Sequence, residues 1–386
     1  MFKMKRTLGI IVLAATLILA SCSEDKSKNN DDIKANNVAE ESVPAISETQ
    51  EVELAEEPET AEDEIEQEEV QEEPEPEFPF TNPLTGEGTE TDLTTIRPIS
   101  VMVNNIKQSL PQIGVSEADV VYEILEEGGI TRLLCVYNNY SDIPEIGSIR
   151  SARDYYIDIA DAHDAIFVHA GGSTYAYTAL ANRGTDDIDG LYVSQFYRSA
   201  ERRKTMSTEH TLMISGSGLD EAIAYKGFRT TSQAQSPLTF GDDYKTGEAP
   251  AEHISIPFVL SAKQKPYITS YFDYGSTSGM YHKGHFGEAH IDGDDGEQLT
   301  FKNVITLTCS MNIIKGDPLG CIQVHFTGTG KGTYNVDGTS REIVWKKDSR
   351  SAPYTLYESD GETPLVVAPG KSYIALVSPN ATLTIK

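Results

Sequence analysis

The sequence predicts an α+β protein in which an N-terminal α/β domain precedes a mostly antiparallel β domain, built as a sandwich or a barrel. In the first part, strand-like apolar runs alternate with helix-like patterns, and one run passes through Gly171-Gly172 directly into a helical pattern, the order of an α/β layer. In the later part, short apolar runs alternate with turn sequences such as GDDGE and VDGT, which is typical of antiparallel sandwiches and barrels. We therefore predict folded domains over residues 81–235 and 236–386.

The N-terminus reads as an export signal. The basic stretch MFKMKR is followed by an apolar run from Leu8 to Ala20, which is shorter than the roughly 20 residues that span a bilayer. The small residues that end at Cys22 are similar to the bacterial lipobox, in which cleavage leaves the Cys as the lipidated first residue. We predict a signal peptide over residues 1–21 and acyl chains such as palmitate on Cys22, which would hold the protein on the extracytoplasmic face of the cell membrane. An uncleaved anchor or an ordinary secretory signal is the alternative.

Residues 22–80 are predicted to form a disordered acidic linker behind the lipidated Cys22. From residue 23 to residue 80 the chain holds 22 acidic and three basic side chains, and its only aromatic residues, Phe78 and Phe80, stand at the end. Low hydrophobicity and like-charge repulsion keep such a segment solvated. We interpret it as a stalk. The alternative is an acidic segment that docks a partner or binds cations.

The charge balance excludes nucleic acid as a partner. The formal net charge is −29, and no compact cluster of Lys and Arg would bind a phosphate backbone against it. Cysteine use predicts no zinc site, because no Cys-x-x-Cys pair occurs beside Cys135, Cys309 and Cys321. The turn between the last two would allow a disulfide, but the expected hairpin register places residue 324 opposite Cys309. We expect neither a metal nor a cofactor.

The predicted N-terminal domain contains strands and helices in alternation. Strands are expected over residues 97–105, 130–139 and 164–170, and helices over 151–162 and 174–182. Residues 115–127 show apolar side chains at helical spacing, with Ser116 as the N-cap and Gly128-Gly129 as the end of the helix. The inner part of this segment, VVYEIL, also fits a strand.

The predicted C-terminal domain needs no helix. Its apolar runs predict short strands over residues 255–260, 267–274, 280–285, 299–311, 320–326, 333–336, 341–347, 354–358, 364–368 and 372–379. Their regular spacing is the basis for the sandwich or barrel.

Several long stretches resemble the YerB-like family of bacterial lipoproteins. They include RPISVMVNN, PQIGVSEADVVYEILEEGGITRLL, IGSIRSARDYYIDIADAHDAIFVHAGGS and GETPLVVAPGKSYIALVSP. The resemblance covers nearly all of residues 80–386 and implies a surface lipoprotein of Gram-positive type with two domains of unknown function, without an assigned reaction. Two positions depart from the family pattern: Asn104-Asn105 stands where similar proteins read Asp-Asn, and Glu209-His210-Thr211 where they read Pro-His-Asn.

A candidate anion site combines two arginines with a glycine turn. Arg150 and Arg153 are spaced to share one face of a helix, and arginine suits forked contacts with carboxylate or phosphate. The turn formed by His169, Gly171, Gly172 and Ser173 leads a strand into a helix, where free N–H groups favour anions. His210 is a further candidate ligand contact. The alternative is that the arginines pair with nearby acids and that the glycines only form a tight turn.

A second candidate is an acid/base group made of Glu123, Glu126 and Glu127. Paired carboxylates of this kind would serve glycoside cleavage in a cell wall, whereas the structural alternative is a surface ion pair with Arg132. The cluster His282, His285 and His290 fits no familiar metal site, and Lys283 within it would repel a cation.

Three functional hypotheses remain open at this point. The first is a noncatalytic envelope lipoprotein that binds an anionic ligand or a cell-wall fragment through the N-terminal domain. The second is a wall-modifying hydrolase that uses Glu123, Glu126 or Glu127 with His210. The third is a scaffold that binds another envelope protein and has no small-molecule site.

Overall fold

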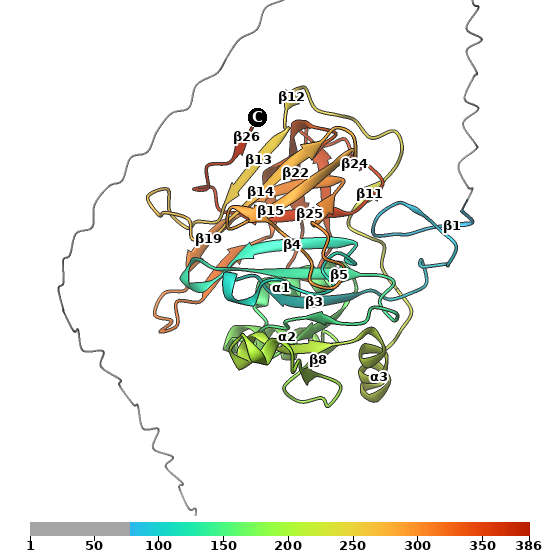
Figure 1. Cartoon of the computed structure of the whole chain (residues 1–386). Coiled ribbons are helices and arrows are strands. Elements are labelled where there is room, and N and C mark those ends of the chain that lie inside the picture. Colours follow the sequence, from blue (N-terminus) through green and yellow to red (C-terminus); the bar gives the residue numbers. More distant parts are fainter. Residues whose placement is uncertain (1–77) are drawn as a thin grey trace, which may run out of the picture. The chain divides into compact units, whose positions relative to one another are not determined.

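Two β-sheets dominate residues 78–386, the part of the chain that the computed structural model describes (Figure 1). These residues belong to one compact unit. The predicted signal peptide, the predicted lipidation at Cys22 and nearly all of the predicted linker lie outside the described residues. The result is a mixed α/β protein with three α-helices among its described elements, made mostly of strands.

The larger sheet has eleven strands and mixed pairing. In spatial order it contains β12 (Ala249–Pro250), β22 (Thr339–Lys347), β21 (Gly328–Val336), β18 (Asn303–Thr308), β25 (Ser372–Val377), β4 (Val120–Leu125), β5 (Thr131–Tyr137), β3 (Ile99–Asn104), β7 (Ile166–His169) and β8 (Asp187–Asp189), while β23 (Tyr354–Glu358) pairs with β22. Strand β25 runs parallel to both of its neighbours, β18 and β4. The N-terminal and C-terminal segments therefore share one sheet, and the boundary near residue 235 stays a prediction.

The second sheet is antiparallel and comes from the C-terminal segment. Its strands are β13 (His253–Pro257), β14 (Thr269–Gly275), β15 (Met280–His285), β16 (Glu288–Ala289), β17 (Thr300–Phe301) and β26 (Thr384–Ile385). It packs over β25, where the ring of Phe272 lies 4.6 Å from that of Tyr373 between centroids. The predicted antiparallel character of this segment is confirmed for the second sheet, whereas β18 and β25 belong to the mixed sheet.

Smaller pairings complete the strands. They are β1 (Phe80–Thr81) with β2 (Gly88–Thr89), β10 (Leu212–Ile214) between β6 (Ile146–Gly147) and β9 (Tyr197–Arg198), β11 (Thr239–Phe240) with β24 (Val366–Val367), and β19 (Ser310–Ile313) with β20 (Ile322–His325). In the last pair Ser310 lies opposite His325, and Cys135, Cys309 and Cys321 are all free thiols.

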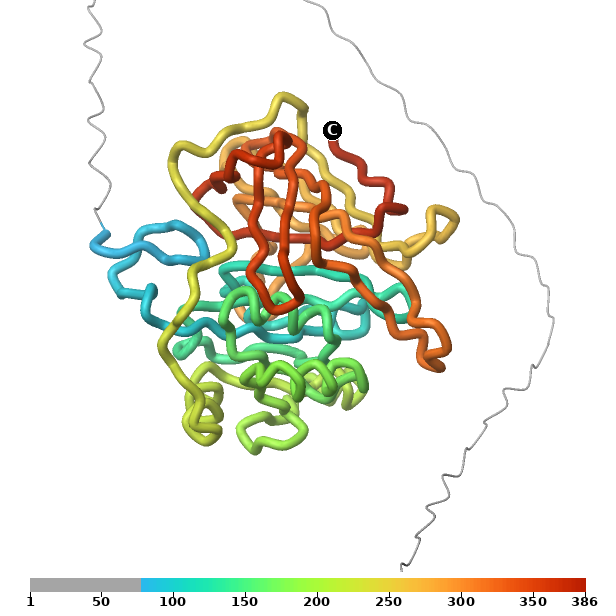
Figure 2. The backbone as a smooth tube through the Cα atoms, turned by 180° about the vertical axis from the view of Figure 1, so that it is seen from behind, coloured from blue at the N-terminus to red at the C-terminus, as the bar shows by residue number. Residues whose placement is uncertain are grey.

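Three helices accompany the N-terminal strands: α1 (Asp154–Ala162), α2 (Thr174–Arg183) and α3 (Gly216–Lys226). Helix α1 packs against β4, where the hydroxyls of Tyr155 and Tyr156 donate to the backbone carbonyls of Leu125 and Ile124. After α3 the chain runs along the outside of the molecule toward the second sheet (Figure 2). Short 3-10 turns occur at η1 (Lys107–Ser109), η2 (Glu127–Gly129), η3 (Arg202–Lys204) and η4 (Thr208–His210). The predicted strands and helices over 97–105, 130–139, 164–170 and 174–182 are thus confirmed, the helix predicted over 151–162 is confirmed from Asp154 onward, and α3 is not among the predicted elements.

The predicted helix over residues 115–127 is wrong, and the strand alternative is correct. The segment forms β4, which is buried on both faces: the Tyr122 hydroxyl lies 2.7 Å from Nε2 of His163 at the end of α1, and Ser270 of the second sheet donates to Glu123. A strand buried on both faces carries a continuous apolar run, which periodicity alone does not separate from a helix. The Gly128-Gly129 pair lies in the turn η2 before β5.

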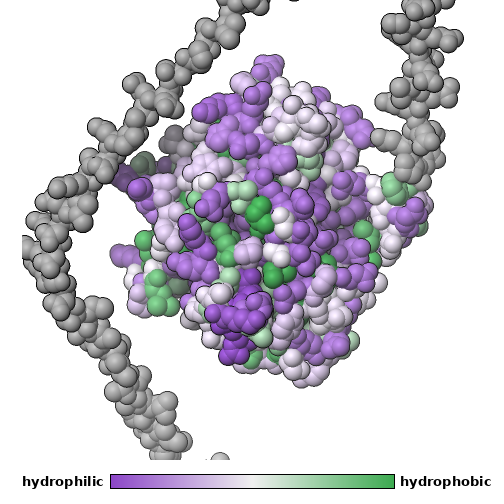
Figure 3. Space-filling model, in the orientation of Figure 1, coloured by the Kyte–Doolittle hydropathy of each residue, from purple (hydrophilic) through white to green (hydrophobic). Residues whose placement is uncertain are grey.

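No helix among the described residues is long and apolar enough to cross a membrane. The face shown in Figure 3 is largely hydrophilic, and its apolar side chains gather in a few small patches.

Candidate functional site

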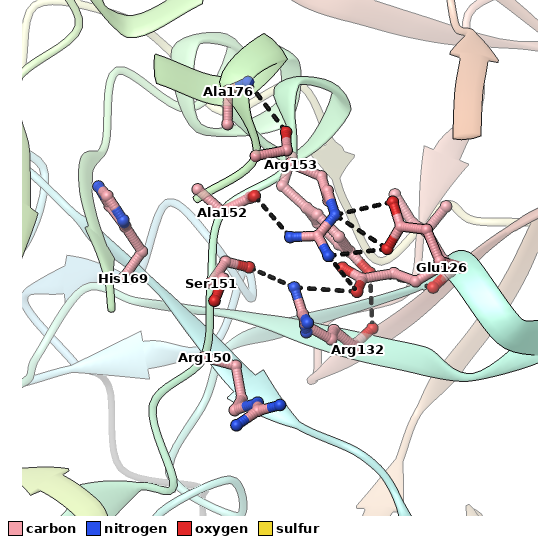
Figure 4. A network of polar contacts seen from close by, with 12 residues as sticks. Glu126, Arg132, Arg150, Ser151, Ala152, Arg153, His169 and Ala176 are labelled. Carbon is pink, nitrogen blue, oxygen red and sulfur yellow. Dashed lines mark hydrogen bonds and ion pairs between the residues drawn. The ribbon is translucent and has the colours of Figure 1, made fainter. Parts of the chain in front are cut away.

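Arg132 and Arg153 lie in a buried cluster with two glutamates. Arg153 donates from Nε and NH2 to both oxygens of Glu127 at 2.7–3.1 Å, and NH1 of Arg132 lies 2.9 Å from Oε2 of Glu126. Figure 4 shows both arginines turned toward Glu126. Burial raises the pKa of the Glu126 carboxyl in spite of the attraction of Arg132 and Arg153. These two guanidinium groups are therefore already balanced by acids of the protein itself.

Arg150 differs from these two arginines because no buried acid pairs with it. Its side chain is 21% exposed, and Nε has no hydrogen-bond partner within residues 78–386. Burial and the nearby Arg132 guanidinium lower the pKa of Arg150, although Glu209 opposes this effect. NH1 donates to the backbone carbonyl of Glu209 at 3.0 Å, so Arg150 is a half-buried cation whose buried Nε is left without a partner.

The expectation that Arg150 and Arg153 share a helix face is wrong. Helix α1 begins at Asp154, and Arg153 precedes it in an extended conformation. The backbone of Arg150 donates to Met102 of β3 and accepts from Ala170, so this segment runs beside the sheet. The two side chains diverge, and Arg150 points away from Glu126 (Figure 4).

The turn after β7 satisfies most of its own polar groups. Buried His169 contacts the carbonyl oxygen of Gly171 through Nδ1 at 2.8 Å, and the amide of Gly171 donates to Asp189. The hydroxyl of Ser173 caps α2 by accepting from the amide of Ala176, and Gly172 pairs with Ala152. In Figure 4 the His169 ring points away from the arginine cluster. These contacts account for the turn as local structure.

Glu209 lies between Arg150 and His210, and its carboxylate is held loosely by both. Oε2 is 3.4 Å from NH1 of Arg150, and Oε1 is 3.6 Å from Nε2 of His210. The Glu209 side chain is 59% exposed, so it can leave this position without unfolding anything around it. The structure thus brings Arg150 and His210 together around a weakly held carboxylate.

His210 is oriented by the end of β3. Nδ2 of Asn104 donates to Nδ1 of His210 at 3.0 Å, so the neutral ring carries its proton on Nε2, which faces Glu209. Burial, Arg150 and Arg202 lower the pKa of His210, while Glu209 opposes them. Asn104 and Glu209, the two positions expected from the sequence to depart from the family pattern, both contact His210.

A second polar cluster is fully buried between the two sheets. Glu123 accepts hydrogen bonds from Asn105, Thr131, Ser270 and Tyr373 at 2.6–2.9 Å, and the ammonium of Lys283 lies 3.6 Å away. Burial alone would raise the pKa of Glu123, but Lys283 and these hydrogen bonds hold it below its usual value. The buried ion pair and its hydrogen bonds join β4 to β14 and β15.

The cluster closes into a ring of hydrogen bonds. Lys283 donates to Nδ1 of His290 at 3.0 Å, and Nε2 of His290 donates to Gln112 at 2.7 Å. Gln112 in turn donates to the Asn105 side chain and to the backbone carbonyl of Asn104. The ring therefore reaches the residue that orients His210.

His285 beside this ring gives the protein a predictable sensitivity to acid. Burial and the Lys283 ammonium lower the pKa of His285 from 6.5 to about 4. As the pH falls below 6.5, His285 becomes protonated in the unfolded chain, whereas in the folded protein it stays neutral until about pH 4. We therefore expect protonation of His285 in the unfolded chain to lower the free energy of unfolding by about 3 kcal/mol between pH 7 and pH 4. Urea unfolding at a series of pH values should show that the free energy of unfolding falls less steeply with decreasing pH in His285→Gln than in the original protein. The control variant His325→Gln, at an exposed histidine, should show the original pH dependence.

The histidine cluster does not assemble a metal site. No group of three or more His, Cys, Asp or Glu side chains in the described part of the chain is placed to hold a metal ion. His285 and His290 stack at 5.0 Å between ring centroids, and the Lys283 ammonium bonds to His290.

The three candidate acid/base glutamates are not available to a substrate as they stand. The carboxylates of Glu123 and Glu126 have no exposed surface, and both oxygens of Glu127 accept hydrogen bonds from Arg153. Across residues 78–386 no hydrogen bond or ion pair joins His210 to any of the three.

Comparison with known proteins identifies a family and a relative of this chain. Residues 84–229 match the family model described as "Protein of unknown function (DUF3048) N-terminal domain", and residues 258–374 match the corresponding C-terminal domain. The chain is 31% identical over 300 residues to the Bacillus subtilis (strain 168) protein named "Putative lipoprotein YerB", a match that covers 76% of this chain and 85% of that one. It also superposes on the crystal structure of YerB from Bacillus subtilis with a TM-score of 0.68 and 27% identity, covering 79% of this chain and 99% of the other.

Proposed function

We propose that this protein, which belongs to the DUF3048 family and is homologous to the protein named "Putative lipoprotein YerB", is anchored by lipid on the extracytoplasmic face of the membrane. We also propose that it binds an anionic ligand at Arg150 and His210. The observation that carries this proposal is the position of the Glu209 carboxylate. The exposed Glu209 carboxylate accepts a long hydrogen bond of 3.4 Å from NH1 of Arg150 and lies 3.6 Å from Nε2 of His210, beyond hydrogen-bond distance. A ligand carboxylate or phosphate would displace it and bond both donors directly.

The balance of charges supports Arg150 as the anchor for the anion. Arg132 and Arg153 both pair with the buried Glu126, whereas the carboxylate that pairs with Arg150 belongs to the exposed Glu209. Hydrogen bonds between charged groups contribute about 1.5–3 kcal/mol, more than an exposed ion pair does. Exchange of Glu209 for a better-placed ligand anion is therefore favourable. Arg153 and the turn from His169 to Ser173 serve this site as structural support in our proposal.

The proposed lipid anchor is supported by the lipobox-like sequence that ends at Cys22 and by the name of the relative. We propose that lipid on Cys22 tethers the folded part to the membrane through the acidic linker over residues 22–80. An alkyne-labelled fatty acid should be incorporated by the protein in cells and not by a Cys22→Ser variant, which should also leave the membrane fraction. Equal labelling of the two proteins would contradict the anchor and leave the binding site untouched.

The competition by Glu209 gives a direct test of the binding proposal. Replacing this residue, Glu209→Gln, removes an exposed competitor for Arg150, so we expect phosphate or acetate to bind roughly threefold more tightly. Thermal-shift titrations of the purified protein with each anion measure the change. Glu201→Gln removes the same charge from a side chain that is 81% exposed, and it should leave the affinity unchanged. Weaker or unchanged binding by Glu209→Gln would contradict the displacement of this carboxylate.

The hydrolase hypothesis receives no support from the geometry of the described residues. It would require at least one of Glu123, Glu126 and Glu127 to reach a substrate, but Glu123 and Glu126 are buried and the partly exposed Glu127 is bound by Arg153. A binding function needs no such rearrangement.

A further inference from the structure

A pocket of about 610 Å³ opens beside the anion site. Glu209 and His210 line one part of it, and the exposed surface of the lining is mostly apolar. The apolar side chains come from three separate segments: Ile106 follows β3, Ile130 precedes β5 and Tyr267 precedes β14, while Met206 belongs to the same loop as Glu209. The volume falls within the range of small-molecule sites.

The pocket combines polar and apolar surface. Glu209 and His210 line it, and Arg150, which is not part of the lining, lies 3.4 Å from the Glu209 carboxylate. Ile106, Ile130 and Met206 offer surface that a purely ionic ligand such as inorganic phosphate would leave in contact with water. A ligand that fills both parts must itself be charged at one end and apolar along its body.

We propose that the ligand is an amphipathic anion, with one carboxylate or phosphate group at Arg150 and His210 and an apolar body in the pocket lined by Ile106, Ile130, Met206 and Tyr267. This inference rests on the proposed anion site and specifies its ligand. The charged group provides orientation, because Arg150 and His210 donate to it from one side. The apolar body provides most of the affinity, because each methylene removed from water adds to binding.

The test is a series of ligands that differ only in chain length. Acetate, butanoate, hexanoate and octanoate are titrated into the purified protein, beside the butyl, hexyl and octyl phosphates and hexanol. We expect affinity to rise about fourfold per methylene until the pocket is full. The carboxylate and phosphate arms identify the preferred head group, and hexanol should bind at least tenfold more weakly than hexanoate. The apolar wall is tested with Tyr267→Ala, since Tyr267 is 50% exposed and its loss leaves the core intact. This variant should show a smaller gain in affinity per methylene than the original protein.

The outcomes separate this inference from the function on which it rests. Acetate or phosphate binding that does not grow with chain length would overturn the amphipathic ligand and leave the anion site in place. Absence of binding by every carboxylate and phosphate would overturn both. Equal affinity for hexanol and hexanoate would also overturn the inference, because the charged end would then contribute nothing.

Discussion

Replacing Lys283 with methionine is expected to lower the free energy of unfolding by about 3 kcal/mol or more. Lys283 and Glu123 have no exposed side-chain surface, and their charges compensate each other between the two sheets. Without the ammonium, the Glu123 carboxylate keeps only neutral hydrogen-bond donors such as Ser270 and Tyr373. Urea unfolding of Lys283→Met measures the loss as a lower midpoint with an unchanged slope.

The matched variants assign this loss to the ion pair. Combining Lys283→Met with Glu123→Gln removes both charges, so the double variant should be more stable than Lys283→Met alone. At the exposed Lys263, the same substitution, Lys263→Met, should change stability by no more than about 0.5 kcal/mol. A double variant that loses the sum of both single effects would contradict the compensation of the two charges.

Replacing Arg150 with glutamine is expected to weaken anion binding roughly thirtyfold. The substitution removes the charged donor, and a charge-assisted hydrogen bond contributes about 2 kcal/mol. Calorimetric titration with octanoate or phosphate measures the change. The fold should persist, because Arg150 pairs with the exposed Glu209 and with no buried acid.

Two further substitutions separate charge from geometry at this position. Arg150→Lys keeps the charge but loses the planar fork, so it should recover only part of the affinity. Arg203→Gln removes an exposed arginine from the neighbouring turn η3 and should bind as the original protein does. Unchanged binding by Arg150→Gln would remove Arg150 from the site.

The local elements could be predicted because each carries its own pattern. The run IFVH, the glycines after it and the helical pattern TYAYTALAN predict β7, the turn and α2. The C-terminal strands are marked by turns in the same way. Strand β4 was misread as a helix because burial on both faces removes the alternation that identifies a half-exposed strand. The conformation of Arg150 and Arg153 differs from the prediction because α1 begins at Asp154, three residues after the predicted start of the helix at residue 151.

The long-range contacts carried no local signal. Ser270 and Glu123 are 147 positions apart, and Tyr373 reaches the same carboxylate from 250 positions away. Nothing in the neighbourhood of Lys283 indicates that its partner stands on β4. Similarly, His210 and Arg150 were candidates from separate motifs, and only the fold brings them together around Glu209. The apolar residues that line the pocket beside His210, Ile106, Ile130 and Tyr267, carry no mark of a pocket in the sequence.

The most direct test of the account observes the Arg150 side chain while an anion binds. In a protein labelled with nitrogen-15, the Arg150 Nε–H signal is identified by its absence from Arg150→Gln. We expect the chemical shift of this signal to change and then reach a plateau as phosphate or octanoate is added, because Nε has no partner in the described structure. The Nε–H signal of Arg153, already bound to Glu127, should move much less. A stationary Arg150 signal at saturating anion would contradict the central claim that this guanidinium holds the ligand.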